Sequence, residues 1–366
     1  MKYYKLNDLC TDIVDCPHTT PDWKNEGIRV VRNFNLKDGN LDFTDGYFVD
    51  EATYLERTKR AIPEEGDIII SREAPMGVVG IVPKGLKCCL GQRLVLLKVN
   101  KGKCDPYYLL NTLMSDFVQT QFKRADATGS IVSNLCIPDL KEIIIPVIES
   151  GQEDVARLLE IINKKQLINN AINDNLEQQI QLIFDYLFPD VCAGNKHMGD
   201  FIIPKRGKSL LSKNAVHGNV PVIAGGLEPS IYHNVANTIA PVVTISSSGA
   251  NAVFVNIWGV PVWSSDSSYI DSEMSRYVYF WYAYLKRHQN NIYNIQTGSA
   301  QPHIYPSHIS SLPITDLDYK KIENYTEIVS PIFSTITKNH VENQHLQSLR
   351  DWLLPMLMNG QATIND

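Results

Sequence analysis

Several short runs of residues match parts of catalytic or ligand-binding motifs, but none of these motifs is complete. Gly207-Lys208-Ser209 matches the end of a phosphate-binding P-loop, yet the position five residues earlier, which requires glycine, is Ile202. Asp105-Pro106-Tyr107-Tyr108 lacks the second proline of the Asn/Asp-Pro-Pro-Tyr motif of amino-methylating enzymes. Cys16-Pro17-His18 offers two types of metal ligand without a second pair nearby, so we interpret it as a turn. We therefore expect no catalytic centre, no cofactor site and no metal site in this chain.

The chain contains an internal repeat of about 170 residues. Thr128-Gly129-Ser130 recurs as Thr297-Gly298-Ser299, 169 positions later. Each copy of this tripeptide follows strand-like segments and one helix-like segment. Each also precedes a strand-like segment, Ile143–Pro146 in the first copy and Ser311–Ile314 in the second. The shared order indicates a duplicated module.

Each copy of the module is followed by a long helical pattern. Apolar residues recur there at steps of three and four, which predicts one apolar stripe on each helix. A stripe of this length needs a partner, and we predict that the two helices pair antiparallel with each other. The predicted seam consists of Ile168, Ile172, Leu176, Ile180, Ile183 and Leu187 in the first helix and Leu346, Leu349, Leu353 and Leu357 in the second.

Asparagines interrupt both helical patterns near their middle. Two interpretations are open: these residues form a solvated helix face, or some of them lie between the helices and fix the register of pairing at a cost in stability. The residues are Asn169, Asn170, Asn173 and Asn175 in the first helix and Asn339 and Asn343 in the second.

The resulting fold class is α+β, with two related α/β modules separated by a long antiparallel two-helix coiled coil as an internal pseudo-repeat. The first module covers residues 1–148 and the first spacer helix covers residues 149–188. Residues 189–317 form a linker and the second module, and residues 318–366 form the second spacer helix.

Composition indicates a folded, water-soluble protein. Hydrophobic residues make up 44% of the chain and charged residues 20%. The chain has no stretch of about 18 apolar residues, the length that is needed to cross a membrane. The seven cysteines show neither a disulfide framework nor paired zinc-ligand spacing. We therefore expect reduced thiols and a cytoplasmic location.

The net charge of −6 argues at first against a polyanionic partner. However, the acidic excess is concentrated in residues 149–191, with 3 basic and 8 acidic side chains, and in residues 315–366, with 4 and 7. Residues 1–148 carry 19 basic and 20 acidic side chains, and residues 192–314 carry 8 and 5. The two modules are thus neutral or basic, and a polyanion remains compatible with them.

Together these features resemble the DNA specificity subunits of type I restriction-modification systems. The residues that carry the resemblance are Gly66-Asp67-Ile68-Ile69-Ile70-Ser71-Arg72, Ala127-Thr128-Gly129-Ser130, Ile143-Ile144-Ile145-Pro146-Val147 with Gly151-Gln152-Glu153, and Leu346-Gln347-Ser348-Leu349-Arg350-Asp351-Trp352-Leu353-Leu354.

The resemblance implies two target-recognition domains, each of which reads half of a bipartite site in double-stranded DNA. It also implies a non-catalytic subunit that directs other proteins to that site. The expected partners are two methyltransferase subunits, which bind S-adenosylmethionine and modify adenine, and ATP-driven restriction and translocase subunits. S-adenosylmethionine, ATP and Mg are accordingly expected on the partner subunits and not on this chain.

Residues for DNA contact follow from the resemblance and from the chemistry of DNA. Glycine lets the backbone approach a phosphate, while Arg, Asn and Gln distinguish base edges in the major groove. For phosphate positioning we expect Thr128, Gly129, Ser130, Thr297, Gly298 and Ser299. For base or backbone contact we expect Arg72, Gln92, Arg93 and Lys123 in the first module and Lys205, Arg206, Lys208, Ser247 and Gln301 in the second. The aromatic run 277–282 is interpreted as helix core.

Two alternatives remain open from the sequence. A non-catalytic protein scaffold would use the duplicated modules to bind two copies of a partner. A hydrolase without a recognisable motif would turn over substrate as an isolated chain.

Overall fold

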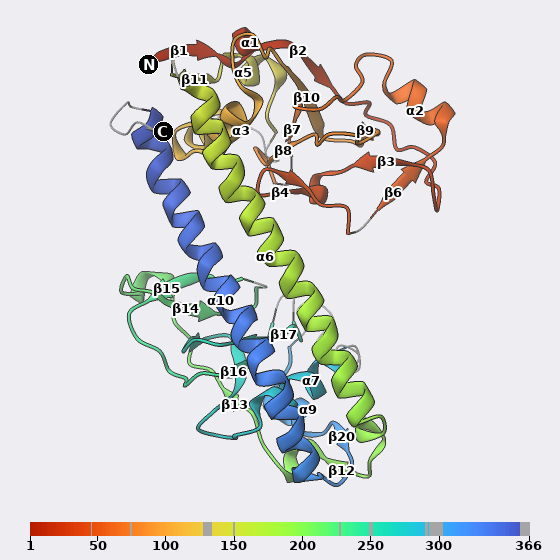
Figure 1. Cartoon of the computed structure of the whole chain (residues 1–366), viewed down its shortest axis with the longest axis vertical. Helices are drawn as coiled ribbons and strands as arrows, with labels where there is room; N and C mark the ends of the chain where they lie inside the picture. The colour runs from red at the N-terminus through yellow and green to blue at the C-terminus, as the bar shows by residue number, and fades with distance from the viewer. Residues whose placement is uncertain are drawn as a thin grey trace. The chain divides into compact units, whose positions relative to one another are not determined.

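The computed structural model of the chain divides into two compact units. Unit 1 comprises residues Met1–Gln166 and Gln344–Asp366, and unit 2 comprises Leu167–Asn343 (Figure 1). The structure describes residues 1–44, 46–73, 75–126, 134–148, 151–226, 228–248, 252–289, 292 and 303–358. Both units mix helices and sheets.

Unit 1 is built on a four-stranded antiparallel sheet with the order β2-β10-β7-β8. A second sheet has the order β6-β3-β9, in which β3 runs parallel to β9, and β1 pairs antiparallel with β11. The strands are β1 (Lys2–Lys5), β2 (Cys10–Asp15), β3 (Ile28–Val31), β4 (Leu36–Lys37), β5 (Asn40–Leu41), β6 (Tyr47–Val49), β7 (Ile68–Ser71), β8 (Val79–Ile81), β9 (Cys88–Leu90), β10 (Leu94–Val99) and β11 (Ile144–Val147). The helices are α1 (Leu6–Leu9), α2 (Glu51–Arg57), α3 (Pro106–Met114), α4 (Asp116–Asp126) and α5 (Ile137–Glu142).

Unit 2 has sheets of the same kinds. Its four-stranded sheet has the order β13-β19-β16-β17, its three-stranded sheet the order β15-β14-β18, and β12 pairs with β20. The strands are β12 (Lys196–His197), β13 (Lys205–Arg206), β14 (Val220–Ile223), β15 (Ile231–His233), β16 (Val242–Ser246), β17 (Val255–Trp258), β18 (Trp263–Ser264), β19 (Ser267–Asp271) and β20 (Pro313–Ile314). The shorter helices are α7 (Val278–Arg287) and α9 (Pro306–Ser310).

The registers of the two units correspond residue by residue. Leu94 pairs with Ser71 in unit 1, and Ser267 pairs with Ser246 in unit 2. The Leu135 amide donates to the carbonyl of the residue after Ser71, and the Ile304 amide donates to the carbonyl of the residue after Ser246, at 3.0 and 2.9 Å. Equivalent positions can therefore be assigned from hydrogen bonds where the side chains differ.

Local sequence explains why the key elements of unit 1 form where they do. In β7 the run Ile68-Ile69-Ile70 is β-branched and fully buried, as expected for a central strand covered on both faces. Helix α3 begins at Pro106 because the Asp105 carboxylate accepts hydrogen bonds from the Tyr107 and Tyr108 amides at 2.8 and 3.0 Å. Such caps fix the helix on which Tyr108 and Leu109 enter the core.

The two long helices are α6 (Gln152–Leu187) and α10 (Tyr319–Met358), where the sequence predicted spacer helices at 149–188 and 318–366. Residues 359–366 lie outside the described part of the chain. In unit 1, Val155 and Leu159 of α6 share a buried cluster with Leu354 and Leu357 of α10. In unit 2, Ile180 and Phe184 of α6 share one with several residues of α10: Ile322, Tyr325, Val329, Phe333 and Ile336.

Part of the predicted seam is wrong. Ile168, Ile172 and Leu349 are 56%, 42% and 42% exposed, so they face solvent. Leu346 is half-buried, and the remaining predicted seam residues, Leu176, Ile180, Ile183, Leu187, Leu353 and Leu357, are buried or partly buried in the two cores. Near position 170, α6 buries instead the polar residues that follow Ile168 and Ile172. Consecutive residues lie about 100° apart around a helix, so the two sets face different directions.

The residues buried there are asparagines. Asn169 and Asn173 are 1% and 4% exposed. The Asn169 amide donates to Glu342 at 2.8 Å and to Asn343 at 2.9 Å, and the Asn339 amide donates to Asn173 at 2.8 Å. Asn343 in turn donates to Asn170 at 2.8 Å, whereas the exposed Asn175 accepts a hydrogen bond from Gln179 of the same helix. Residues further along α6 bond to residues earlier in α10, so the two helices run antiparallel within unit 2. These polar side chains set the register of the pairing.

Replacement of Asn169 by leucine should lower the free energy of unfolding by about 1–3 kcal/mol, because Glu342 and Asn343 lose a hydrogen-bond donor in a buried setting. Urea denaturation of the full chain measures this. Asn175→Leu is the matched control, since it makes the same change at an exposed position of the same helix. Equal effects of the two substitutions would contradict a role for Asn169 in helix pairing.

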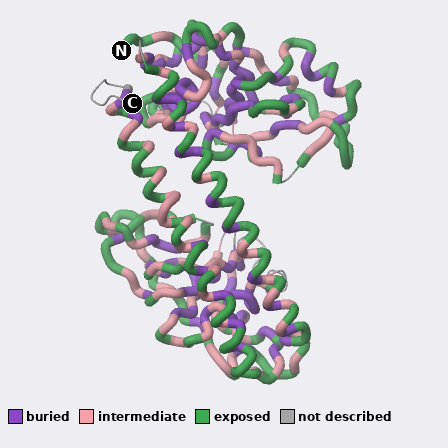
Figure 2. Tube along the Cα trace, in the orientation of Figure 1, coloured by how far each residue is buried: buried purple, intermediate pink, exposed green. Residues whose placement is uncertain are grey.

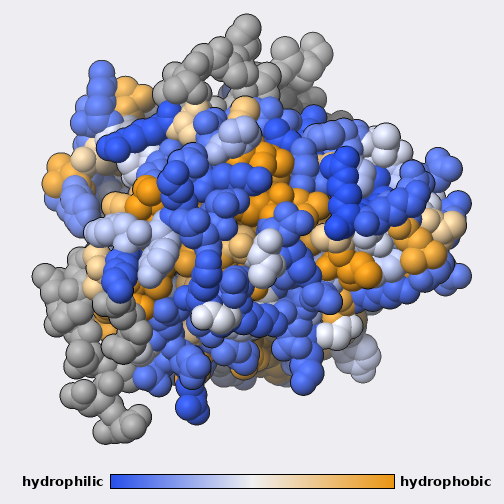
Figure 3. Space-filling model, turned by 90° about the horizontal axis from the view of Figure 1, so that it is seen from above, coloured by the Kyte–Doolittle hydropathy of each residue, from blue (hydrophilic) through white to orange (hydrophobic). Residues whose placement is uncertain are grey.

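In each unit, buried residues of the main sheet cluster with buried residues of the helices (Figure 2). In unit 2 the aromatic run interpreted as helix core is confirmed, because Phe280, Trp281 and Tyr282 of α7 are buried. The face in Figure 3 is mainly hydrophilic, with hydrophobic groups in separate patches. In the described part of the chain, no helix has an apolar stretch long enough to span a membrane.

The cysteines are free thiols, and most are buried. Burial raises the pKa of Cys88 to about 12 and that of Cys89 to about 11. Cys10 and Cys104 have pKa values of about 12 for the same reason. At pH 8 a thiol with a pKa of about 12 is ionised in only about 1 molecule in 10,000, so it reacts very slowly.

Exposed Cys136 should therefore be the one thiol of the native protein that reacts rapidly with an aromatic disulfide reagent at pH 8. The expected stoichiometry is one fast thiol per chain, rising to seven after denaturation. Cys136→Ser should remove the fast phase. A fast phase that survives this substitution would show that another cysteine is accessible.

Candidate functional site

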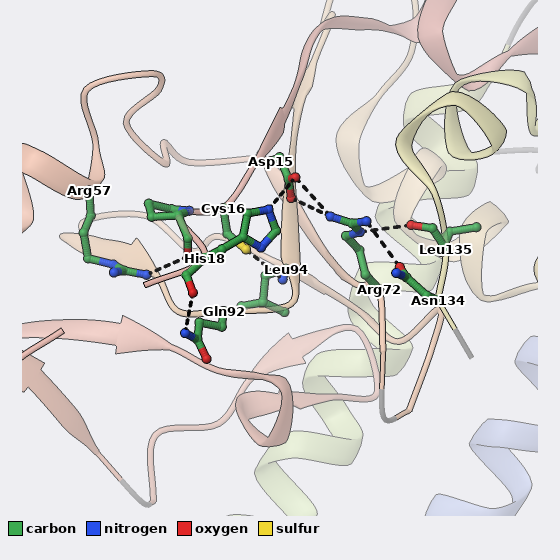
Figure 4. Close-up of polar contacts among 10 residues, drawn as sticks. Asp15, Cys16, His18, Arg57, Arg72, Gln92, Leu94, Asn134 and Leu135 are labelled. Atoms are coloured by element: carbon green, nitrogen blue, oxygen red, sulfur yellow. Dashed lines mark hydrogen bonds and ion pairs between the residues drawn. The ribbon is translucent and has the colours of Figure 1, made fainter. Parts of the chain in front are cut away.

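The polar cluster of unit 1 lies where three strands of the main sheet end or begin (Figure 4). Strand β2 ends at Asp15, β7 is followed by Arg72, and β10 begins at Leu94. Both carboxylate oxygens of Asp15 accept from Arg72 Nη1 at 3.0 Å, and Asp15 Oδ2 lies 3.1 Å from His18 Nε2. One carboxylate thus joins a largely buried guanidinium to an exposed imidazole.

The remaining donors of Arg72 are also engaged. Its Nε donates to the Leu135 carbonyl at 3.0 Å and its Nη2 to Asn134 Oδ1 at 3.2 Å. The side chain is only 13% exposed. Arg72 therefore holds the segment at residues 134–135 against the sheet, and we no longer expect it to read a base.

The loop after β2 is fixed from two sides. Arg57, at the end of α2 and 8% exposed, donates to the carbonyls of Leu90, Thr19 and Pro17 at 2.9, 3.0 and 3.3 Å. Gln92 Nε2 donates to the His18 carbonyl at 2.6 Å and to Thr20 Oγ1 at 3.1 Å. The side chains of His18, Thr19 and Thr20 remain exposed on this fixed backbone.

The Cys16 thiol lies behind the same loop. Burial raises its pKa, although the Leu94 amide, which donates to Cys16 Sγ at 3.3 Å, opposes the rise. Cys16 is thus a protonated core residue, in line with the interpretation of Cys16-Pro17-His18 as a turn. Among the described residues no group of three His, Cys, Asp or Glu side chains could hold a metal ion.

Unit 2 also carries an ion pair near the corresponding strand ends, but its acidic member, Asp266, precedes β19 and so corresponds to Arg93 and not to Arg72. Arg206, at the end of β13, donates to Asp266 Oδ1 at 2.5 Å, and Ser248 donates to the other oxygen of Asp266. Arg206 pairs with Ser268 as Asp15 pairs with Val95. The edge strand therefore ends in a carboxylate in unit 1 and in a guanidinium in unit 2.

The other predicted contact residues fall into three groups. Lys123, Lys205 and Lys208 are exposed and remain candidates for DNA contact. Arg93 is exposed, with a left-handed φ of 66°, and its Nε lies 3.2 Å from Glu73. The six Thr-Gly-Ser residues and Gln301 lie outside the described residues.

The prediction for Ser247 is wrong. Its side chain is fully buried and its Oγ has no hydrogen-bond partner among the described residues, so it cannot reach an external ligand in this conformation. It occupies the position of Arg72, since its amide donates to the Asp266 carbonyl as that of Arg72 donates to the Arg93 carbonyl. Nothing in the run Ser246-Ser247-Ser248 indicated from the sequence that the Ser247 side chain is buried.

Sequence reasoning did not single out Asp15, Arg57, Asp266 or Trp263 as functional residues. Each acts through a contact with a residue distant in the chain, such as Arg57 with Leu90, 33 positions away. The prolines at positions 17 and 21 indicated a turn there. No pattern in the sequence indicated which side chains hold this loop in place.

Comparisons with known proteins agree with the resemblance. Residues 1–178 match the family model "Type I restriction modification DNA specificity domain". A specificity subunit assigned to the type I restriction enzyme MjaX of Methanocaldococcus jannaschii is 27% identical over 135 residues, which cover 37% of this chain and 30% of that relative. The crystal structure of a type I restriction-modification S subunit from M. genitalium matches with a TM-score of 0.56 at 18% identity, over 96% of this chain and 94% of the other, and so shares its fold. Residues 1–178 are thus similar to the type I restriction-modification DNA specificity domain, as the sequence indicated.

Proposed function

We propose that this chain is a sequence-specific DNA-binding subunit of a type I restriction-modification system. The observation that carries the proposal is the contrast between the two units. Their sheets correspond in order and register, while the side chains at the ends of the equivalent edge strands, Asp15 and Arg206, have opposite charges. A common framework with different polar groups is what two readers of different base sequences require.

The target we propose is bipartite. Unit 1 and unit 2 act as copies of one recognition module, and each reads one half of the site. The antiparallel contacts of α6 with α10 support the coiled-coil spacer expected from the sequence, with the asparagines of unit 2 setting its register.

In this proposal the chain supplies recognition and its partners supply chemistry. Two methyltransferase subunits and the restriction and translocase subunits assemble with it and are directed to the site. S-adenosylmethionine, ATP and Mg belong to those subunits. These assignments rest on the resemblance to type I specificity subunits and on the absence of a complete catalytic motif in the sequence.

Duplex binding across a range of salt concentrations tests the proposal. We expect the full chain with its methyltransferase to retain one bipartite duplex selectively from a random library. Affinity should fall steeply with salt, with a slope of about −5 in log–log form if about six phosphates are neutralised. No salt dependence on any duplex would favour the protein scaffold, and turnover by the isolated chain would favour a hydrolase.

A further inference from the structure

Two loops occupy equivalent positions after the edge strands of the two units. The amide of Cys16 donates to the Leu94 carbonyl at 3.1 Å, and that of Gly207 donates to the Ser267 carbonyl at 2.8 Å. Leu94 and Ser267 are themselves equivalent by strand register. Pro17 therefore corresponds to Lys208, and His18 corresponds to Ser209.

The same carbonyl is held in both loops, but by unrelated side chains. The Pro17 carbonyl accepts from Arg57 Nη2 at 3.3 Å, and the Lys208 carbonyl accepts from Trp263 Nε1 at 2.8 Å. Arg57 ends helix α2, whereas Trp263 lies in strand β18. Because the donors differ in chemistry and in position, the shared feature is the held carbonyl and not a shared donor residue.

The first loop is held by a buried cation, Arg57, whose burial costs free energy. Arg57 is a buried cation whose described hydrogen bonds go to three backbone carbonyls, and no described carboxylate pairs with it. Burial of a charge is unfavourable unless hydrogen bonds compensate, and an apolar side chain would avoid that cost. Two of the three bonds go to the carbonyls of residues 17 and 19, so the main effect of the guanidinium is to order the loop.

The loops present different hydrogen-bonding groups beside this equivalent carbonyl. The first exposes His18, Thr19 and Thr20, and the second exposes Lys208 and Ser209. The imidazole of His18 is further oriented by Asp15. Hydroxyl, imidazole and ammonium groups all bond to base edges, and lysine favours the O6 and N7 atoms of guanine.

We propose that residues 17–20 and 208–211 are the loops that determine specificity, each of which contacts base edges of one half-site in the major groove of duplex DNA. Arg57 and Trp263 are positioning residues that act through these loops. The inference rests on the proposed function and assigns which residues perform it.

Alanine substitution of the exposed loop residues tests direct readout. His18→Ala with Thr19→Ala should reduce discrimination between matched and mismatched first half-sites by about 10-fold or more, and leave the second half-site unaffected. Ser209→Ala should do the reverse. Lys84→Ala, at an exposed position of unit 1 outside the loop, is the control and should change neither. All binding is measured with the full chain and its methyltransferase on duplex libraries.

Trp263→Phe tests positioning, because it keeps an aromatic ring beside His233 and removes only the Nε1 donor. We expect about 10-fold weaker discrimination of the second half-site, with an unchanged urea midpoint and an unchanged salt slope, because no phosphate contact is lost. Trp352→Phe, at a 60% exposed position, controls for the substitution itself. A lower midpoint together with lost discrimination of both half-sites would assign Trp263 to the fold and overturn its positioning role.

The outcomes separate the two proposals. If the unaltered chain selects a bipartite duplex and the loop variants keep both preferences, the loops are not the readers and this inference fails alone. If the unaltered chain discriminates among no duplexes, the proposed function fails and this inference fails with it.

Discussion

Phe184→Ala is expected to lower the free energy of unfolding by about 3–5 kcal/mol, the largest stability effect of any single substitution proposed for this chain. Phe184 is fully buried in unit 2. Its ring lies 5.2 Å from that of Phe188 and 5.6 Å from those of Phe280 and Tyr325. Truncation would open a cavity where α6, α7 and α10 meet and would remove three aromatic contacts at once.

Urea denaturation measures this loss, and Trp281, whose ring lies 5.1 Å from that of Phe280, provides a local fluorescence signal. Tyr186→Ala is the control, because Tyr186 lies two residues further along α6 and is 85% exposed. Its effect should stay within about 0.5 kcal/mol. Similar losses for the two variants would mean that the aromatic cluster does not stabilise unit 2.

The sequence predicted those features that depend on residue type and spacing. The aromatic run 277–282 predicted a helix core, because burial of such residues in the core is strongly favourable. The positions of the two long helices followed from an apolar spacing that few other structures satisfy.

The seam near residue 170 could not be predicted in the same way. Ile168 and Asn169 lie about 100° apart on the helix, so one of them must face away from α10. The apolar pattern favours Ile168, whereas the structure buries Asn169 because Glu342 and Asn343 accept its hydrogen bonds. That choice depends on a partner 173 residues away and is invisible in a local pattern.

The candidate site shows the same limit. Arg72 and Ser247 were both predicted to contact DNA, but one pairs with Asp15 and the other is buried. Only strand register reveals that they occupy equivalent positions. Exposed Lys208 was selected from its charge, while the residue that holds its carbonyl, Trp263, could be identified only once β18 was placed beside it.

Exchange of residues 192–314 for the second module of another family member should change one half of the methylated motif and leave the other half intact. Methylation at the original motif should fall to background, because a mismatched half-site typically costs specific binding several orders of magnitude. The structure shows how to make the exchange. Strands β12 and β20 pair within the exchanged segment, so both ends move together. Phe280 packs against Phe184, Phe188 and Tyr325, so the donor's residues at those three positions must accompany the module.

Methylome sequencing of cells that carry the exchanged chain reads the result directly. The reciprocal exchange of residues 1–148 is the matched control, and it should alter the opposite half of the motif. A motif that changes in both halves after either exchange would mean that the units do not read DNA independently. A motif that changes in neither half would mean that recognition resides outside residues 1–148 and 192–314, because each exchange replaces every exposed loop of its module while the packing of α6 against α10 is kept.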